Sequence, residues 1–567
     1  MRLFAALLVS LLVAGGLWVW CDRPVAVEPN WDKPLASVSF APFRRGQSPL
    51  TKVYPSPAQV EEDLRSLVGL ARGIRTYSSR EGMEVVPELA ARLGLKVIFG
   101  AWLTNQTEAK GRLTNEAEVE ALIKAANQYP DAIERVLVGN EVLLRRDLTP
   151  EQLIGYIRRV KAAVRQPVSY ADVWAFYLKY PEVARELDYL TIHILPFWED
   201  EPVPIDRVEQ HITAIVDRMR QAFPGKPILI GEAGWPSLGR DRGPAVVNTV
   251  NEAAFVRRMA DIAERHHFDY NIVEAFDQPW KAALENTVGA AWGVLDIDRR
   301  AKFGMSGPVT EVADWPLRAA LALAAGALAT VAFGRGIAGL PALLSFALLA
   351  QGLAWAAVTT AFHAEAVSFR WWQDLWAVFR GGLAVALALA VADRAGNLLA
   401  GSSTVLFGRP ATNRPSAWGE RLTIFFGLYA VVWTLLLTVD GRYRDIPDID
   451  FSVPVIGLAA LAVIRALCSE GNWRAAIAVD NLFADTRAER SRLLRWLAGG
   501  LVAGAGLALI SEGVAVIGED FMIDHPTLGE QVPLVLSGMI ANREMILWAV
   551  MQLVMAVPFV AASRRVI

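Results

Sequence analysis

Two glutamates stand directly after apolar, β-branched stretches of the sequence. Glu141 ends "RVLVGNE" (Arg135–Glu141), and Glu232 ends "PILIGE" (Pro227–Glu232). A carboxylic acid and a carboxylate that flank one sugar can protonate a glycosidic oxygen and attack the anomeric carbon, which is the chemistry of glycoside hydrolysis. The alternative is that both side chains are merely solvated at strand ends. The pair is useful only if the fold brings both side chains to one place.

Eight short β-branched stretches, separated by helical patterns, are typical of a strand–helix alternation. They are Ser37–Phe43, Gly73–Tyr77, Lys96–Trp102, Arg135–Glu141, Pro167–Val173, Tyr189–Ile194, Pro227–Glu232 and Asn271–Asp277. Eight alternations in about 280 residues predict an α/β fold, the (β/α)8 TIM barrel. A doubly wound open sheet would also alternate, but no Gly-rich phosphate loop follows the first stretch. In a TIM barrel the C-terminal strand ends share one mouth, where we expect both glutamates.

Further side chains are expected at the same mouth because they end or follow the predicted strands. The polar ones are Tyr77, Asn140, His193, Asp277 and Lys281. Trp235 and Trp280 follow the seventh and eighth stretches, and an indole face there could stack on a sugar, although a lone Trp can also be a packing residue. The 6 histidines and 2 cysteines form no ligand motif, so we expect no metal and no cofactor.

The second half of the sequence is strongly apolar, with recurring stretches of membrane-spanning length. They are Trp315–Phe333, Ile337–Phe362, Trp372–Val391, Leu422–Val439, Val453–Leu467, Trp496–Ile517 and Met545–Ala562. Their lengths suit a hydrocarbon core about 30 Å thick. We therefore predict an N-terminal membrane anchor or signal segment over 1–21, the barrel over 22–314, and an all-α polytopic transmembrane domain of about seven helices over 315–567.

Charged loops predict the orientation of the chain. Arginines concentrate in alternate loops, whereas the intervening loops carry acidic stretches such as "DIPDID" (Asp445–Asp450) and "GEDFMID" (518–524). By the positive-inside rule this pattern places the barrel on the outer side, in the periplasm of a bacterial inner membrane, with lipid as a partner. The net charge of −3 does not favour nucleic acid as a partner.

Three motifs together resemble glycoside hydrolase family 17, the β-1,3-glucanase family of clan A. They are "VGNE" (Val138–Glu141), "GEAGWPS" (Gly231–Ser237) and "EAFDQPWK" (Glu274–Lys281). The resemblance covers roughly Ala36 to Phe303. The chain departs from the family pattern at Ala233, where Ser is usual, and at Gln278, where Glu is usual. Fusion to a multi-pass segment is further similar to bacterial proteins implicated in making cyclic β-(1,3),(1,6)-glucans.

The resemblance implies roles for the candidate residues. Glu141 looks like the general acid/base, Glu232 like the nucleophile, and Asn140 like the contact to the sugar 2-hydroxyl. His193 stands where clan A places a residue that bonds the nucleophile, although simple packing is the alternative, and Tyr77 resembles a tyrosine near the cleavage point. Clan membership implies retention of configuration, with the carboxyl groups about 5–5.5 Å apart.

Several functions are compatible with these features. The first is a β-1,3-glucan transglycosylase that joins a glucan donor to a glucan acceptor; the second is a hydrolytic β-1,3-glucanase. A third is a non-catalytic glucan-binding scaffold that partners a glucan synthase or exporter. A sugar-nucleotide glycosyltransferase is disfavoured because "RLLRW" (Arg492–Trp496) lacks the expected Gln. In the apolar half, Arg380 and Glu512 are expected to line a glucan path or to pair with each other or with water.

Overall fold

The computed structural model describes residues 1–401, 417–439, 443–468, 473–483, 491–517 and 525–563. The chain divides into two compact units, Pro24–Glu311 and a second unit formed by Met1–Arg23 with Val312–Ile567. Part of the topology prediction rests on loop residues that lie outside the described ranges, namely Arg409, Arg414, Arg487, Arg490, Arg564, Arg565 and the stretch 518–524.

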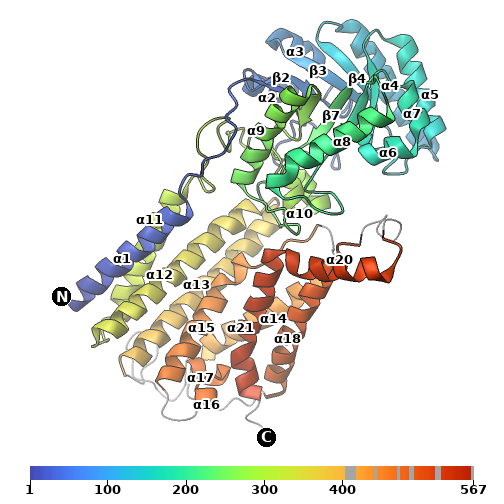
Figure 1. Ribbon diagram of the computed structural model, residues 1–567. Coiled ribbons are helices and arrows are strands. Elements are labelled where there is room, and N and C mark those ends of the chain that lie inside the picture. The colour runs from blue at the N-terminus through green and yellow to red at the C-terminus, as the bar shows by residue number, and fades with distance from the viewer. Residues whose placement is uncertain (402–416, 440–442, 469–472, 484–490, 518–524, 564–567) are drawn as a thin grey trace. The chain divides into compact units, whose positions relative to one another are not determined.

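Residues Pro24–Glu311 contain a closed barrel of eight parallel strands arranged in chain order (Figure 1). The strands are β1 (Leu35–Ser39), β2 (Ala71–Arg75), β3 (Lys96–Ala101), β4 (Ile133–Asn140), β5 (Val168–Val173), β6 (Leu190–His193), β7 (Ile228–Ala233) and β8 (Asp269–Ile272). The barrel closes where Val38 of β1 pairs with Ile272 of β8. The predicted (β/α)8 fold class is therefore confirmed.

Helices separate the strands, and their starts follow from local sequence. They are α2 (Pro57–Leu67), α3 (Val86–Leu93), α4 (Ala109–Gln128), α5 (Pro150–Ala163), α6 (Trp174–Lys179), α7 (Pro181–Glu186), α8 (Val208–Ala222), α9 (Thr249–His266) and α10 (Ala282–Ala290). Ser56 and Thr149 cap α2 and α5 through reciprocal capping boxes with Gln59 and Gln152. Pro in the first helical turn completes both starts, because its missing N–H is not needed there.

Both faces of the barrel sheet are packed. Val97 and Phe99 of β3 belong to the large core between strands and helices. Ile98, between them, points to the other face and packs with Leu137, Ala171, Tyr189 and Leu229. Alternating side chains thus fill both sides of the sheet, which is why the strands read as almost continuous apolar runs.

Several strands end earlier than their sequence pattern suggests, β2 and β8 among them. β2 ends at Arg75 and β8 at Ile272, so Tyr77 and Asp277 lie in the loops that follow. After β8, the amides of Glu274 and Asp277 donate to the carbonyls of Trp292 and Leu295 rather than to a strand ladder. The apolar pattern continues past the strand because this loop is itself buried.

The second unit is helical. Its helices are α1 (Arg2–Cys21), α11 (Trp315–Phe333), α12 (Leu340–Ala366), α13 (Trp371–Leu399), α14 (Ala417–Leu437), α15 (Ser452–Leu467), α16 (Trp473–Ala476), α17 (Val479–Phe483), α18 (Ser491–Val514), α20 (Leu528–Ala541) and α21 (Arg543–Ser563). Within the described ranges, 8 helices are long and apolar enough to cross a membrane, α1 among them. Each of the seven predicted spans overlaps one of the seven such helices other than α1. Helix α20 was not predicted, because it is short and contains Pro533.

Helix α1 packs with one face against other helices of the helical unit. Trp18 is 4% exposed, and its ring stacks on Trp355 of α12 with 4.3 Å between centroids. Ala6, Ser10 and Ala14 are also buried, and their spacing of four residues defines one helix face. The N-terminal segment is thus an integral part of this unit.

The charged residues of the helical unit pair differently from the expectation. Arg380 of α13 forms an ion pair with Asp450, just before α15, and Glu512 of α18 pairs with Arg444. Asn542 also donates to Glu512 at 2.9 Å. The expectation that Arg380 and Glu512 pair with each other is therefore wrong. Each instead meets an opposite charge that lies elsewhere in the chain, in or beside "DIPDID".

Candidate active site

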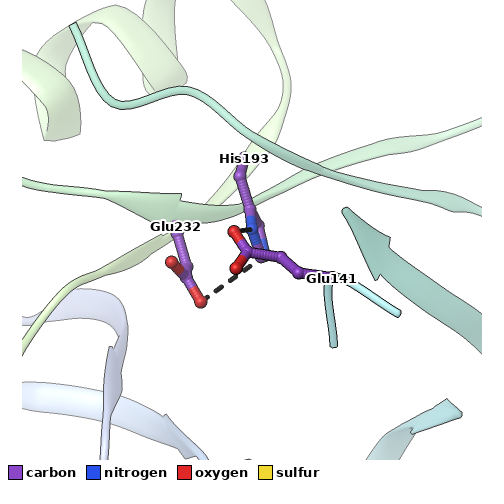
Figure 2. Close-up of side chains that lie close together, drawn as sticks. All are labelled: Glu141, His193 and Glu232. Carbon is purple, nitrogen blue, oxygen red and sulfur yellow. Dashed lines mark hydrogen bonds and ion pairs between the residues drawn. The ribbon is translucent and has the colours of Figure 1, made fainter. Parts of the chain in front are cut away.

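The fold brings the two glutamates to one mouth of the barrel. Glu141 directly follows β4, and Glu232 is the penultimate residue of β7. One carboxylate oxygen of each and a ring nitrogen of His193 lie within 4.8 Å of one another (Figure 2). The two carboxylates face the same space, which is the geometric condition that two-carboxylate chemistry imposes.

An unusual backbone conformation aims Glu141 into this space. Its φ is +49°, in the left-handed region that non-glycine residues seldom adopt. The Glu141 amide donates to the carbonyl of Ala171 in β5 at 2.7 Å, and its carbonyl accepts from the Arg145 amide at 2.8 Å. These bonds hold the strained residue in place, as is common where a side chain must be presented to a ligand.

His193, the last residue of β6, lies between the two carboxylates (Figure 2). Its Nδ1 is 2.9 Å from Glu141 Oε1, and its Nε2 is 3.6 Å from Glu232 Oε1. The imidazole is 1% exposed. The predicted contact is with the nucleophile position, whereas the shorter contact is with Glu141.

Arg75 of β2 is a site residue that sequence reasoning missed. It is 1% exposed, and its guanidinium donates to the carbonyl of Gly231 at 2.6 Å and to Asn140 Oδ1 at 2.6 Å. Its Nη1 is also 3.5 Å from Glu232 Oε1. Arg75 therefore ties the ends of β2, β4 and β7 together. The available signal was a charged residue within the predicted stretch Gly73–Tyr77, which is otherwise uncharged, since buried charges need a partner.

Gly231 allows this close approach. A Cβ on that residue would lie 2.5 Å from the Thr191 side chain and 3.2 Å from Arg75 Nη1. Any larger residue would push the guanidinium or β6 away from Glu232.

Tyr77 lies beside the same cluster. Its hydroxyl is 2.9 Å from Ser39 Oγ, and the Arg75 guanidinium lies over its ring at 4.7 Å from the centroid. Burial, together with the charge of Glu232, raises the pKa of the Tyr77 hydroxyl well above its ordinary value. Tyr77 therefore stays a neutral hydrogen-bond donor beside Glu232.

The environment of Glu141 favours its ionised form. Burial raises the pKa of this carboxyl, but the hydrogen bond and charge of His193, with the charges of Arg145 and Arg75, lower it further, and the net direction is down. Glycoside hydrolysis by two carboxyl groups requires one of them to carry a proton. Burial by itself would favour the protonated form of Glu141, but the nearby positive groups outweigh it and favour the ionised form.

Asp172 of β5 is a third carboxyl near the site, and it was not anticipated from the sequence. It is completely buried and accepts a hydrogen bond from the Tyr170 hydroxyl. Burial raises its pKa to about 6, with Tyr170 lowering it and the charge of Glu141 raising it. Asp172 therefore titrates in electrostatic contact with Glu141.

Lys281 is electrostatically connected to both glutamates. Its Nζ pairs with the buried carboxylate of Glu274, which stands in the same motif and was not singled out. Burial lowers the pKa of Lys281, while the carboxylates of Glu285, Glu232 and Glu141 raise it. Lys281 thus lies close enough to the mouth to feel both candidate catalytic charges.

Trp280 is partly exposed in the loop after β8. Its ring meets Phe43 edge to face at 5.9 Å, and its Nε1 donates to Gln278 Oε1 at 2.8 Å. Gln278 is 1% exposed and donates in turn to the Ala41 carbonyl at 2.6 Å. Gln278 therefore anchors the loop that carries Trp280.

Trp235 has no face free for a sugar, so the stacking role predicted for it is wrong. The residue is completely buried and packs against Phe197 and Phe255 at 6.0 Å between centroids. Its Nε1 donates to the Val246 carbonyl at 3.0 Å. The turn after β7 directs this indole into the core rather than across the mouth.

Asp277 is engaged by other partners. Its Oδ1 lies 3.0 Å from Lys302 Nζ and accepts from the Gly293 amide at 2.9 Å. Lys302 also pairs with buried Glu252 at 2.9 Å. None of these partners belongs to the cluster of Glu141, His193 and Glu232.

The same three side chains could in principle ligate a metal ion. Two carboxylates and an imidazole are common ligands for divalent cations. However, the Arg75 guanidinium lies 3.5 Å from Glu232 Oε1 and opposes a second positive charge there. The donor set suits a sugar better than a cation.

Comparisons with known proteins agree with this geometry. Residues 37–293 match the BtgE/BtgC glycoside hydrolase domain. A glucan 1,3-beta-glucosidase of Arthroderma benhamiae is 27% identical over 278 residues, which are 45% of this chain and 87% of that protein. A probable beta-glucosidase btgE of Aspergillus flavus is 26% identical over 39% of this chain, which spans only 36% of that relative's length.

Part of the chain is also similar to solved structures. A glycoside hydrolase family 17 beta-1,3-glucanosyltransferase from Rhizomucor miehei is 26% identical, with a TM-score of 0.41. The match covers 47% of this chain and 95% of that one.

Proposed function

We propose that the chain, whose residues 37–293 match the BtgE/BtgC glycoside hydrolase domain, is a membrane-bound, retaining β-1,3-glucan transglycosylase. The observation that carries the proposal is the convergence of Glu141 and Glu232 on His193, with one oxygen of each carboxylate and a ring nitrogen within 4.8 Å. This spacing favours direct attack by a carboxylate, because an inverting pair stands about 6.5–9.5 Å apart to admit a water molecule.

In the first step Glu232 attacks the anomeric carbon of a bound glucan. The glycosidic bond breaks, and Glu141 gives its proton to the leaving oxygen. Because Glu141 is held ionised in the resting site, this proton has to be supplied, and His193 Nδ1 at 2.9 Å is placed to share it. Arg75 and Tyr77 hold Glu232 in position for the attack.

In the second step an acceptor hydroxyl attacks the same carbon. The ester bond to Glu232 breaks, a new glycosidic bond forms, and Glu141 takes the hydroxyl proton. The ionised state favoured at Glu141 suits this base role. Arg75 fixes the oxygen of the Asn140 amide at 2.6 Å, which leaves Nδ2 as a donor for a sugar hydroxyl.

The substrate class rests on the relatives. Those from Arthroderma benhamiae and Schizosaccharomyces pombe are named glucan 1,3-beta-glucosidases, and the chain covers 87% and 79% of their lengths. A β-1,3-linked glucan is accordingly the proposed donor. Transfer is favoured over hydrolysis because a membrane-tethered enzyme suits remodelling of a newly exported polymer. The hydrolytic glucanase is the second candidate.

The helical unit is the membrane anchor in this proposal. Its support is the 8 long apolar helices among the described residues and the packing of α1 against α12. The alternation of arginine-rich and acidic loops supports the proposal that the barrel faces the periplasm of a bacterial inner membrane. A glucan synthase or exporter is the proposed neighbour.

Product analysis tests the proposal. The detergent-purified full chain is incubated with laminaripentaose, and products are followed by mass spectrometry and linkage analysis. We expect chains longer than the donor or branched chains, and Glu232→Gln should lower turnover by at least about 10³-fold because it removes the nucleophile. Glu134→Gln is the matched control, since Glu134 is an exposed carboxylate at the opposite end of β4.

The outcomes separate the candidate functions. Products that are only shorter than the donor would reject transfer and leave a hydrolase. An unchanged product pattern after Glu232→Gln would contradict catalysis at this site and favour the non-catalytic scaffold.

A further inference from the structure

Trp102 is the most exposed aromatic side chain of the barrel unit. It is 37% exposed, whereas every other Phe, Trp and Tyr of Pro24–Glu311, all of them described, is buried or only partly exposed. Trp102 directly follows β3 (Lys96–Ala101), so it lies at the mouth that contains Glu141 and Glu232. Leaving a large apolar surface in water is unfavourable, and an exposed indole at a site mouth therefore needs an explanation.

The backbone of Trp102 is fixed from beneath. Its amide donates to Glu118 Oε2 at 3.1 Å. The Glu118 side chain is 3% exposed and also accepts from Ser78 Oγ at 2.7 Å and from the Ser79 amide at 3.0 Å. A single buried carboxylate thus joins the loops that follow β2 and β3, and the indole is carried on a rigid base.

One face of the indole is covered by Arg145. The guanidinium carbon lies 4.3 Å from the ring centroid, which is a cation–π contact. Arg145 is itself held by Asp147 Oδ2 at 2.8 Å, by the Leu103 carbonyl at 2.9 Å and by the Asn140 carbonyl. Since Arg145 covers part of the indole, the exposed area lies elsewhere on the side chain.

The stack of Trp102 on Arg145 is connected to Glu141, the proposed acid/base, and not to Glu232, the proposed nucleophile. The Arg145 amide donates to the carbonyl of Glu141 at 2.8 Å, and the Arg145 charge lowers the pKa of the Glu141 carboxyl. A general acid protonates the oxygen of the leaving chain, and the acceptor later occupies the same side. The Trp102–Arg145 stack therefore stands on the side of the leaving chain and the acceptor.

We propose that Trp102, backed by Arg145, is the platform on which the leaving or acceptor glucan ring stacks. The C–H-rich face of a β-linked glucose is apolar and meets the electron-rich face of an indole favourably. The inference rests on the proposed function and adds to it a subsite that discriminates a sugar acceptor from water. Surface packing alone would need neither the rigid base nor a position beside Glu141.

The test separates donor cleavage from acceptor binding. An aryl β-laminaribioside serves as the donor of the full chain, because an aryl leaving group needs no glucose on the acceptor side. Laminaribiose is then titrated as the acceptor, and aryl release and transfer product are both measured. For Trp102→Ala we expect the half-saturating laminaribiose concentration to rise about fivefold to tenfold, as for the loss of one aromatic contact.

Two further variants give the matched comparison. Trp102→Phe keeps an aromatic face and should stay within about twofold of the wild type by the same reasoning. Leu144→Ala, at an exposed apolar residue beside Arg145, should not change the acceptor dependence. If Trp102→Ala does not fold, Trp102→Leu against Trp102→Phe makes the same comparison.

Each outcome has a distinct meaning. Acceptor half-saturation that is unchanged in Trp102→Ala, with aryl release still dependent on Glu232, overturns the platform and leaves the proposed function intact. A wild type that shows no Glu232-dependent aryl release overturns both. A rise of the half-saturating laminaribiose concentration in Trp102→Ala that Trp102→Phe does not show supports the platform.

Discussion

Each of the two units of this protein contains polar side chains in close contact, and the two units differ in how the charged groups are paired. At the barrel mouth, His193 and Arg75 each contact Glu232, and His193 also contacts Glu141. One imidazole is therefore shared between two carboxylates. The Glu141 side chain keeps 24% exposure toward the mouth. Because the imidazole is shared and the site is partly open, a bound ligand can change which of these groups carries a proton.

In the helical unit, two buried arginines each pair with a separate acid. Arg380 pairs with Asp450, and Arg444 pairs with Glu512, with all four side chains at most 9% exposed. Opposite charges matched in this way make neutral units, which suits a low-dielectric interior. The proposed reaction depends on a histidine that two carboxylates share, whereas the matched pairs neutralise buried charges within the helical unit.

The largest expected effect is at the barrel mouth, at the proposed acid/base. Glu141→Gln should lower turnover of laminari-oligosaccharides by about 10²–10⁴-fold, the usual contribution of a general acid–base. Release of a good aryl leaving group needs no proton, so formation of the glycosyl-enzyme from an aryl laminaribioside should fall far less. Burst-phase kinetics with both donors measure the difference. Equal losses on the two donors would contradict the acid role and weaken the contrast between the clusters.

The next effect is in the helical unit and concerns stability. Arg380→Met alone leaves the Asp450 carboxylate buried without its arginine and should destabilise the unit by about 3–5 kcal/mol. The double variant Arg380→Met with Asp450→Leu removes both charges and should recover most of that loss, because replacing a buried pair by apolar residues is often neutral. Thermal unfolding of the detergent-purified chain measures both. A double variant no more stable than the single one would indicate a functional rather than an architectural pair.

The smallest effect is a shift in pH dependence. His193 lowers the pKa of Glu141 against the opposing effect of burial, so His193→Gln should let that pKa rise. The protonated acid then persists to higher pH, and the alkaline limb of kcat/KM should move upward by about one unit, as expected on loss of a nearby opposite charge. The pH–rate profile is measured beside His266→Gln, a histidine at the exposed end of α9. An unmoved limb would show that His193 does not set the Glu141 proton.

The same interaction is expected to make the stability of the barrel depend on pH. A carboxyl whose folded pKa is depressed contributes stability that is present above its unfolded pKa and is lost as the pH falls through the folded value. The Glu141–His193 contact should therefore stabilise the barrel near neutral pH and stop doing so in acid.

Much of this architecture could be predicted because it depends on local sequence patterns. Each barrel strand is a short β-branched run, and each long apolar helix is a continuous stretch, so neither needs knowledge of its partners. In a TIM barrel the C-terminal ends of the strands lie at one mouth. Because Glu141 and Glu232 each end a β-branched run, this rule predicted that they lie close together. The same rule placed Asn140 and His193 in the cluster and located Tyr77 and Lys281 near it.

The sequence by itself thus determined the barrel, the apolar helices and the two carboxylates, since periodicity and strand ends depend on neighbours in the chain. Only the tertiary structure decided which side chains meet. Arg75 reaches Gly231 and Glu232 across the barrel, Trp235 turns into the core, and Trp102 remains exposed on Arg145. Those outcomes depend on strand register, barrel closure and loop direction, and these are set by contacts between residues far apart in sequence, which no local pattern records.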